Sequence, residues 1–379
     1  MDLAAFDYQP RTRLIFGAGT LSRVGELARD LGAKRVLVVT DPGIAKAGYP
    51  ARAIALLEEA GLVAQLFADV HENPTTIDVD HCVQAAREFG ADLLVGLGGG
   101  SSMDTAKGCN FILTNGGRMQ DYWGVNKATK PMLPMIAIPT TAGTGSECQS
   151  FALISDAETH VKMACGDYRA AAKVAILDAE LTVSQPHRVT VCTGIDALTH
   201  ALESAVTLKR NAWSAAFSRE AFRLCHSGFS RVLREPHNID ARAQMLLGAA
   251  YAGIAIEHSM LGAAHSCANP LTAMFHVVHG EAVGVMLPHV IRFNSALPEI
   301  AAIYESYFDG DLPDRVSELQ WEAKMPRSIA DHGVKEEHLQ SLATMAAKQW
   351  TAQFNPRPIG ENDFVDLYRA ALGGSPTPA

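Results

Sequence analysis

The residue types best suited to chemistry are a carboxylate and three histidines in the second half of the chain. Asp196 and His200 lie four residues apart in a segment of helical spacing, so both side chains share one helix face about one turn apart. That geometry suits two ligands of one cation. His265 and His279 follow, each embedded in apolar sequence. Because a histidine in such surroundings is more often a hydrogen-bonded core residue, the sequence leaves open whether the four converge.

Such a ligand set has a definite chemical preference. Three neutral imidazoles and one carboxylate suit divalent iron or zinc, whereas an all-oxygen set would indicate magnesium or calcium. A metal of this kind can bind an alcohol at an open position, lower the pKa of its hydroxyl group and stabilise the alkoxide from which hydride leaves. A nicotinamide could then accept the hydride.

A glycine cluster is a second candidate site. It runs from Leu97 to Lys107 as Leu-Gly-Gly-Gly-Ser-Ser-Met-Asp-Thr-Ala-Lys, after a predicted strand and at the start of a predicted helix. Unpaired backbone N–H groups and the helix dipole attract an anion there, and glycines allow a pyrophosphate to approach the backbone. The alternative is a tight strand-to-helix turn in which Ser101 and Asp104 form a capping box.

Two further segments are candidates for binding a dinucleotide. Asp41 directly follows a predicted strand, where a carboxylate can accept both hydroxyls of an adenosine ribose and would repel a 2′-phosphate. It is equally suited to a turn before Pro42. The segment 139–147, Pro-Thr-Thr-Ala-Gly-Thr-Gly-Ser-Glu, is a hydroxyl-rich loop after another strand, or an ordinary surface loop.

These residues need two kinds of framework. The first half alternates β-branched runs with amphipathic helical stretches, which predicts a parallel sheet covered by helices. Strands are expected at 35–40, 63–67, 92–97 and 135–138, and helices at 52–60 and 77–89. After about Asp178 helical spacing dominates, at 190–207, 213–233, 240–257 and 337–353. We therefore predict an α/β dinucleotide-binding domain over residues 1–185 and an all-α metal-binding domain over 186–379.

Composition restricts the class of protein. The chain has 379 residues, 48% hydrophobic and 19% charged, and no apolar run approaches the roughly 18 to 20 residues of a membrane span. The net charge of −9 disfavours a nucleic-acid partner. Seven scattered cysteines without a Cys-x-x-Cys pair are typical of buried thiols in a reducing compartment. With no signal-peptide pattern at the start, we expect a cytoplasmic protein.

The motifs taken together resemble the iron-containing, or group III, alcohol dehydrogenases. The resemblance rests on Gly-Gly-Gly-Ser-x-x-Asp-x-x-Lys at 98–107, the loop 139–147, Gly-Ile-Asp-Ala-Leu-Thr-His at 194–200, and the pair His265 and His279. It extends from Ile15–Gly19 near the start to Asn355–Pro358 near the end. It implies a small alcohol or aldehyde substrate, NAD as cofactor, Fe²⁺ with Zn²⁺ as the alternative, and a homo-oligomer.

The resemblance also implies roles for individual residues. It makes Asp196, His200, His265 and His279 the metal ligands, and it assigns a set of residues to NAD: Asp41, Asn73, Gly98, Gly99, Gly100, Ser101, Asp104, Thr140, Thr141, Thr144 and Lys162. From the residues alone, Asn73 could simply be fixed before Pro74, and Lys162 could be a solvated surface lysine.

Three departures from the family pattern affect the proton path and the substrate pocket. Asn269 stands four residues after His265, where relatives often have histidine; Gln149 stands where they often have threonine; and the stretch 294–325 is short. A carboxamide does not titrate near neutral pH, so Asn269 can position a group but cannot act as a general base. His258 and His276 are the candidates for the proton relay.

Other functions stay open at this stage. A metal- and NAD-dependent lyase or synthase of the dehydroquinate synthase type resembles the same cofactor domain but would use a different metal set and a basic pocket. A catalytically silent metal- or dinucleotide-binding protein is the alternative from another class.

Overall fold

The computed structural model describes residues 5–374. The described residues form two compact units, one of residues 9–185 and the other of residues 186–374 together with 5–8. Residues 5–8, which the domain prediction assigned to the first domain, thus group with the second unit.

The first unit is built on a six-stranded sheet in which every pairing is parallel. Its order is β1-β9-β6-β4-β2-β3. The strands are β1 (Arg13–Phe16), β2 (Arg35–Val39), β3 (Val63–Phe67), β4 (Leu93–Gly98), β6 (Met135–Pro139) and β9 (Val174–Leu177). The four predicted strands are all present, and β1 and β9 add an edge that the sequence analysis did not predict.

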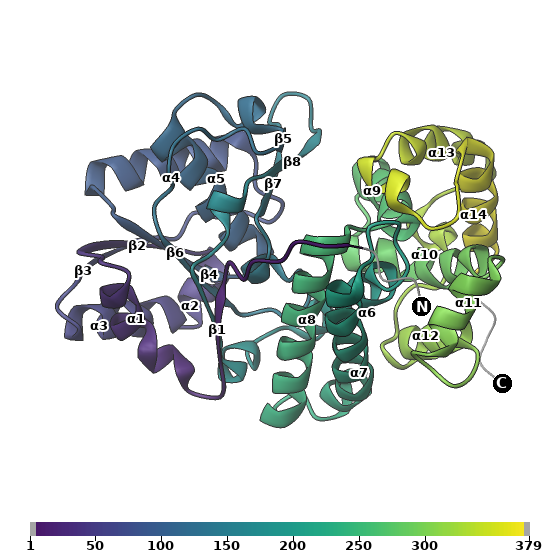
Figure 1. The fold of residues 1–379 in the computed structure, drawn as a ribbon, viewed down its shortest axis with the longest axis horizontal. Helices are drawn as coiled ribbons and strands as arrows, with labels where there is room; N and C mark the ends of the chain where they lie inside the picture. Colours follow the sequence, from purple (N-terminus) through teal and green to yellow (C-terminus); the bar gives the residue numbers. More distant parts are fainter. Residues whose placement is uncertain (1–4, 375–379) are drawn as a thin grey trace. The chain divides into compact units, whose positions relative to one another are not determined.

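Helices cover both faces of this sheet (Figure 1). They are α1 (Val24–Asp30), α2 (Pro42–Lys46), α3 (Tyr49–Glu59), α4 (Thr76–Phe89) and α5 (Gly100–Asn115). Successive side chains of β2 alternate between the faces, so Leu37 and Val39 join the core beneath α4 and α5. Val36 and Val38 join the core beneath α1 and α3. This two-sided burial explains the continuous apolar runs of the central strands.

A smaller sheet of three strands accompanies the first. Its order is β5-β8-β7, formed by Gly124–Val125, Lys162–Gly166 and Phe151–Ser155. This sheet was not predicted from the sequence. The antiparallel pair β7 and β8 follows the hydroxyl-rich loop, and Lys162 is paired with Ser155 at its end.

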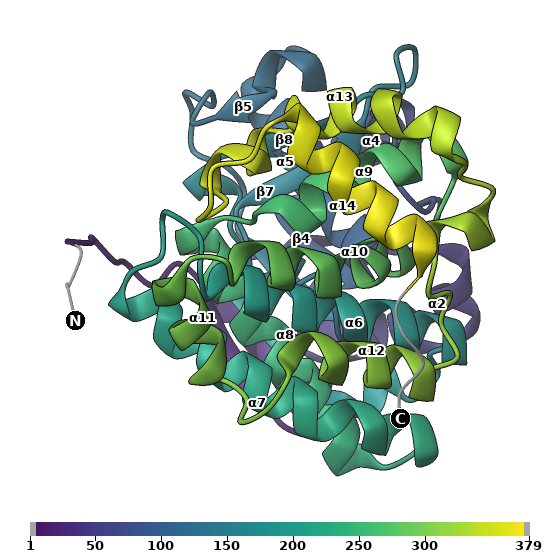
Figure 2. The same ribbon diagram turned by 90° about the vertical axis from the view of Figure 1, so that its right-hand side faces the viewer.

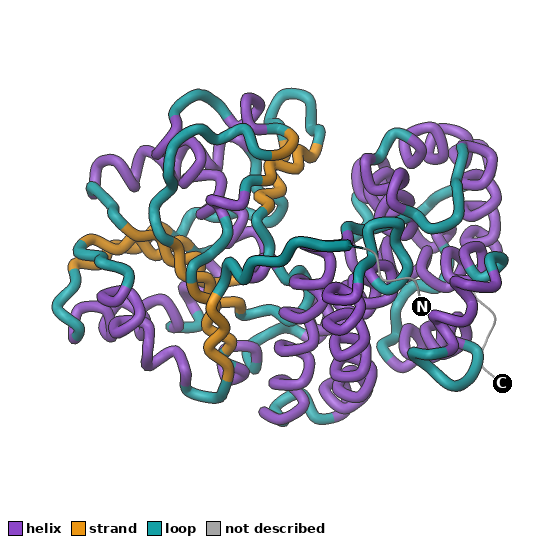
Figure 3. Tube along the Cα trace, viewed as in Figure 1, coloured by secondary structure: helices purple, strands orange, loops and turns teal. Residues whose placement is uncertain are grey.

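The second unit consists of helices and contains no strand among its described residues (Figure 3). They are α6 (His187–Ser204), α7 (Ala212–Arg234), α8 (Ile239–Ser259), α9 (Ala263–Phe275), α10 (His279–Asn294), α11 (Pro298–Glu305), α12 (Leu312–Glu322), α13 (Leu339–Ala347) and α14 (Glu361–Gly373). Helix α6 packs against α7, α8 and α10 (Figure 2). The predicted fold class is confirmed.

One predicted helix is wrong in extent. The segment 337–353 is divided into a 3-10 turn at Glu336–His338, α13, and a second 3-10 turn at Trp350–Phe354. All seven cysteines are buried, and none forms a disulfide bond within the described residues. Across the described residues, no helix combines the length and apolar character that a membrane crossing requires.

Candidate active site

The carboxyl ends of three neighbouring strands bring the predicted cofactor residues of the first unit together. Strands β2, β4 and β6 are adjacent and parallel, so their carboxyl ends lie at one edge of the sheet. Gly98 is the last residue of β4, and Asp41 and Thr140 follow β2 and β6 at the same edge. The Thr140 N–H donates to the Gly98 carbonyl at 2.9 Å. Parallel sheets bind ligands at this edge.

The glycine loop between β4 and α5 depends on the absence of side chains. Gly98 has φ 152°, and a Cβ there would collide with the Ser102 side chain. A Cβ on Gly100 would lie 2.9 Å from Cγ2 of Thr144, so this glycine allows the two loops to approach each other. The capping box considered for Ser101 and Asp104 is not formed, because α5 begins at Gly100 and has Gly99 at its N-cap without a side-chain bond.

Asp41 has a structural role and also faces the glycine loop. Its Oδ1 accepts hydrogen bonds from the N–H groups of Gly43 at 2.9 Å and Ile44 at 3.0 Å, which caps α2. Its Oδ2 lies 3.3 Å from the position that a Cβ on Gly98 would occupy. One oxygen therefore fixes the turn, while the other is presented at the loop expected to hold the dinucleotide.

A buried ionic network, missed in the sequence analysis, fastens the hydroxyl-rich loop to α5. Lys107 is fully buried, and its Nζ donates to the Ser146 carbonyl at 2.6 Å, to Ser146 Oγ at 2.8 Å and to the Phe151 carbonyl at 3.0 Å. Ser146 Oγ in turn donates to Asp104 Oδ1 at 2.7 Å. Burial, opposed by the charge of Lys107, raises the pKa of Asp104 above its usual value. The spacing Asp104-x-x-Lys107 was the available signal.

Hydroxyl groups surround the glycine loop. In the first unit, the buried side-chain oxygens without a hydrogen-bond partner among the described residues include the hydroxyls of Thr40, Ser102, Thr105 and Thr140. A Cβ on Gly99 would lie 3.5 Å from Thr141 Cγ2, so this threonine also borders the loop. Glycines without side chains and unsatisfied hydroxyls fit a polar ligand with several acceptors and donors, such as a dinucleotide.

Asn73 and Lys162, far apart in the sequence, meet in the first unit. Lys162 Nζ donates to Asn73 Oδ1 at 3.4 Å, and both residues are exposed. Asn73 has φ 53°, a left-handed conformation that asparagine tolerates better than most residues. Their contact supports a common role without assigning one.

The second unit brings the four predicted metal ligands together. Asp196 and His200 lie on α6, while His265 is the third residue of α9 and His279 the first of α10. Asp196 Oδ1 lies 3.4, 3.5 and 3.8 Å from the Nε2 atoms of His200, His265 and His279, respectively. The ligand atoms of Asp196, His265 and His279 all lie within 4.8 Å of one another. His200 is outside that set, although its imidazole stacks on His265 with ring centroids 4.9 Å apart.

The unused bonding capacity at this position fits a cation. Asp196 Oδ1 and His265 Nε2 are fully buried, and within the described chain neither forms a hydrogen bond. Burial alone would raise the pKa of Asp196, but the imidazoles, His200 foremost, hold it below its usual value. Burial would likewise lower the pKa of His265, yet Glu203 and Asp196 raise it to about 9. The cluster therefore attracts positive charge, which a proton or a metal ion can supply.

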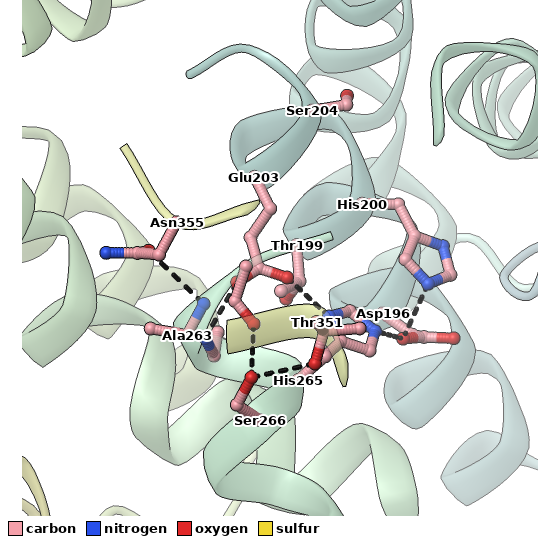
Figure 4. Close-up of polar contacts among 12 residues, drawn as sticks. Asp196, Thr199, His200, Glu203, Ser204, Ala263, His265, Ser266, Thr351 and Asn355 are labelled. Carbon is pink, nitrogen blue, oxygen red and sulfur yellow. Dashed lines mark hydrogen bonds and ion pairs between the residues drawn. The ribbon is translucent and has the colours of Figure 1, made fainter. Parts of the chain in front are cut away.

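A second carboxylate, that of Glu203, contacts His265 (Figure 4). Glu203 Oε2 is 2.5 Å from His265 Nδ1, and Glu203 Oε1 accepts a hydrogen bond from the Ala264 N–H at 2.7 Å. The neighbouring Ala263 N–H donates to Asn355 Oδ1 at 3.3 Å. Glu203 was not among the site residues predicted from the sequence, although it lies seven residues after Asp196 and thus on the same helix face.

The predicted catalytic residues occupy different surroundings. Asn269 is one turn beyond His265 on α9, and its Nδ2 donates to Gln349 Oε1 at 2.9 Å. His276 is exposed at the C-terminal end of α9, with φ 54°. Eleven residues of helical rise place it about 16 Å along the axis from His265, so the structure does not bring these two together. His258, near the end of α8, packs its ring edge-on against Tyr8 at 5.2 Å. The relay roles stay predictions.

Comparisons with known proteins extend over almost the whole chain. Residues 10–179 match the family described as iron-containing alcohol dehydrogenase, and residues 190–372 match the description "Fe-containing alcohol dehydrogenase family, C-terminal". The chain is 34% identical to alcohol dehydrogenase 4 of Schizosaccharomyces pombe, with 98% of this chain and 90% of the relative covered. It is also 34% identical to the NAD-dependent methanol dehydrogenase of Bacillus methanolicus, with 94% and 97% covered. The crystal structure of a 1,3-propanediol oxidoreductase is similar at a TM-score of 0.93 and 32% identity, with 97% and 100% covered.

Proposed function

The chain belongs to the iron-containing alcohol dehydrogenase family, and we propose that it transfers hydride between a small primary alcohol or aldehyde and NAD(H) at a metal held by Asp196, His200, His265 and His279. The observation that carries the proposal is the approach of three imidazole nitrogens to Asp196 Oδ1, at 3.4 to 3.8 Å. The lyase or synthase alternative is not favoured, because the relatives are alcohol dehydrogenases.

Each residue set has a separate task. When bound, the metal supplies a Lewis acid that lowers the pKa of an alcohol hydroxyl group, and the nicotinamide supplies the hydride acceptor. Asp196 would neutralise one positive charge of the cation, and the imidazoles of His200, His265 and His279 would hold the cation in place. In the other unit, Gly98, Gly99, Gly100 and Ser101 would receive the pyrophosphate.

The remaining cofactor residues complete the nucleotide site of this proposal. Asp41 would bind the adenosine ribose, and Asn73 would lie near the adenosine half. The other assigned positions, Asp104, Thr140, Thr141, Thr144 and Lys162, would bind the nicotinamide side directly or hold the loops that do. For Asp104 the second role has support, because its carboxylate already accepts the Ser146 hydroxyl.

The choice of metal follows from the donor set and the family. Nitrogen and carboxylate donors accept both Fe²⁺ and Zn²⁺, and availability decides between them. We propose Fe²⁺ with Zn²⁺ as the alternative. A cytoplasmic location and a homo-oligomer belong to the same proposal and are tested by cell fractionation and light scattering.

A metal-reconstitution assay tests the function. Chelator-treated protein is supplied anaerobically with Fe²⁺ or Zn²⁺, and NADH formation is followed with methanol, ethanol, propanol and propanediol. We expect turnover only with metal, and loss of both bound metal and turnover in His279→Ala. His237→Ala, an exposed histidine in the same unit, is the matched control and should behave like the unaltered protein. Full turnover in a His279→Ala protein that is metal-free by elemental analysis would refute the proposal.

A further inference from the structure

Three side chains of α6 lie on one helix face with spacing i, i+4 and i+7: Asp196, His200 and Glu203. The first two are proposed metal ligands, whereas Glu203 does not reach toward the same point. Its carboxylate lies on the Nδ1 side of the His265 ring, with Oε2 2.5 Å from Nδ1 and Oε1 2.7 Å from the Ala264 nitrogen. Glu203 is 4% exposed, so both contacts are made away from solvent.

The hydrogen-bonding capacity of a carboxylate determines which tautomer His265 adopts beside it. A carboxylate only accepts hydrogen bonds, so the proton of a neutral His265 ring belongs on Nδ1. The lone pair is then on Nε2, the atom that lies 3.5 Å from Asp196 Oδ1. Metal-bound histidines commonly give their other ring N–H to such a partner, which sets the tautomer and the orientation of the ring.

The second carboxylate oxygen fixes the helix that carries His265. Ala264 is in the first turn of α9, where backbone N–H groups have no partner within the helix, and the N-cap residue Gly262 has no side chain to offer. Glu203 Oε1 takes that role from another helix. A single carboxylate thus restrains the backbone of α9 and the imidazole one residue later.

We propose that Glu203 is a positioning residue that holds His265 in the Nδ1–H tautomer with Nε2 directed at the metal. This inference rests on the proposed metal site. The competing explanation is that Glu203 only stabilises the start of α9, with no effect on metal affinity.

The variant Glu203→Gln separates the two explanations. A carboxylate has two accepting oxygens, whereas an amide of the same shape has one. The introduced amide can therefore satisfy the Ala264 N–H or the Nδ1–H of His265, but not both. If the amide oxygen stays on Ala264, its NH₂ group faces Nδ1 and favours a proton on Nε2, which blocks metal binding. If the amide turns, metal binding proceeds only with the Ala264 N–H unsatisfied.

The primary measurement is metal affinity of the chelator-treated protein, by competition with a chromophoric chelator for Zn²⁺ and Co²⁺. We expect Glu203→Gln to bind either ion about 10- to 100-fold more weakly, the range typical of losing such a partner. The affinity for NAD, a property of the other unit, should be unchanged. Ser204→Ala is the matched control, because among the described residues the Ser204 hydroxyl bonds within its own helix, to the Ala201 carbonyl at 3.1 Å.

A second measurement keeps the inference testable if the variant does not fold. With ¹⁵N-labelled histidine, NMR of the zinc-loaded unaltered protein should show His265 protonated at Nδ1 and coordinated through Nε2, the resonances being assigned with His265→Ala. Coordination through Nδ1, or Glu203→Gln protein with undiminished metal affinity, would overturn the positioning role. If the unaltered protein and His279→Ala bind metal equally, the metal site itself is refuted, which is a different failure.

Discussion

The change Lys107→Met tests whether one buried ammonium group organises the cofactor loops. Nζ of Lys107 has three acceptors between 2.6 and 3.0 Å, in Ser146 and Phe151. Ser146 belongs to the hydroxyl-rich loop, which also contains Thr140, Thr141 and Thr144, and Phe151 begins strand β7. Lys107 belongs to the helix that begins at the glycine loop. Methionine fills a similar volume but donates no hydrogen bond.

The size of the stability loss in Lys107→Met depends on the buried polar groups that lose the ammonium group. Two carbonyl groups and Ser146 Oγ lose the ammonium donor, and Asp104 loses the positive charge 3.9 Å from its Oδ1. Removing one partner of a buried charged set costs roughly 3–5 kcal/mol. At about 2–4 °C per kcal/mol for a domain of this size, Tm of the first unit should fall by roughly 6–20 °C. NAD affinity should fall about tenfold or more if the freed loop must be reordered on binding.

Two assays decide the matter: thermal unfolding followed by circular dichroism, and NAD titration followed by fluorescence. Lys173→Met, an exposed lysine in the same unit, is the control and should change neither quantity. The metal content of the second unit should stay the same in both variants. A Tm within about 2 °C of the unaltered protein, or unchanged NAD affinity, would refute the reasoning.

Three other predictions concern single side chains. Asp41→Asn keeps an oxygen to cap α2 but removes the charge expected to repel a 2′-phosphate. The ratio of kcat/KM for NADP to kcat/KM for NAD should therefore rise about tenfold or more, with little change in Tm. An unchanged ratio would contradict the assignment of Asp41 to the ribose. Burial raises the pKa of Glu147 to about 7 from 4.5, so its contribution to stability is present below pH 4.5 and is lost as the pH rises through 7. Glu147→Gln should therefore unfold at nearly the same temperature as the unaltered protein near pH 5 and at a higher temperature at pH 8, and parallel Tm–pH curves would show otherwise. Asn269→Ala should reduce kcat less than the roughly 10²-fold expected for losing a general base and should leave the pH–rate profile unshifted. Gln349→Ala, which removes the hydrogen-bond partner of Asn269, should reduce kcat to the same extent. A larger loss of kcat with a shifted profile would place Asn269 in the proton path.

The parts of the fold that could be predicted are those whose local pattern agrees with their burial. Strand β2 was expected at 35–40, because a run rich in β-branched residues ends there at the turn Asp41-Pro42-Gly43, and four of the five residues of β2 are buried. Strand β1 has only four residues and one buried position, so its sequence contains little periodic signal. Helices α9 and α10 contain Pro270 and Pro288, residues that usually end a helix, and only their packing in the second unit shows that they continue.

The cofactor edge could be predicted in outline because parallel strands present their carboxyl ends together. The sequence could not show how closely the glycine loop and the hydroxyl-rich loop approach each other. Gly100 is compatible with an ordinary helix start, and its need for glycine arises from Thr144, forty-four residues later. Similarly, the acceptors of Lys107 come from a loop and a strand whose positions depend on the whole sheet. Contacts of this range are set by tertiary structure, which local periodicity does not record.

The metal cluster shows the same limit and one overlooked signal. Helical spacing predicts that Asp196 and His200 share a face, but the approach of His265 and His279 depends on how α9 and α10 pack beside α6. Glu203 could have been noticed, since a glutamate in the apolar segment Ala-Leu-Glu-Ser-Ala-Val is expected to be buried, and a buried carboxylate needs a partner. Seven residues after Asp196, it had to lie on the ligand face and one turn beyond His200. A buried carboxylate at this position needs hydrogen-bond donors. Two kinds of donor are at hand: the ring N–H of a ligand histidine and a backbone N–H in the first turn of a helix. Glu203 contacts one of each, at His265 and Ala264.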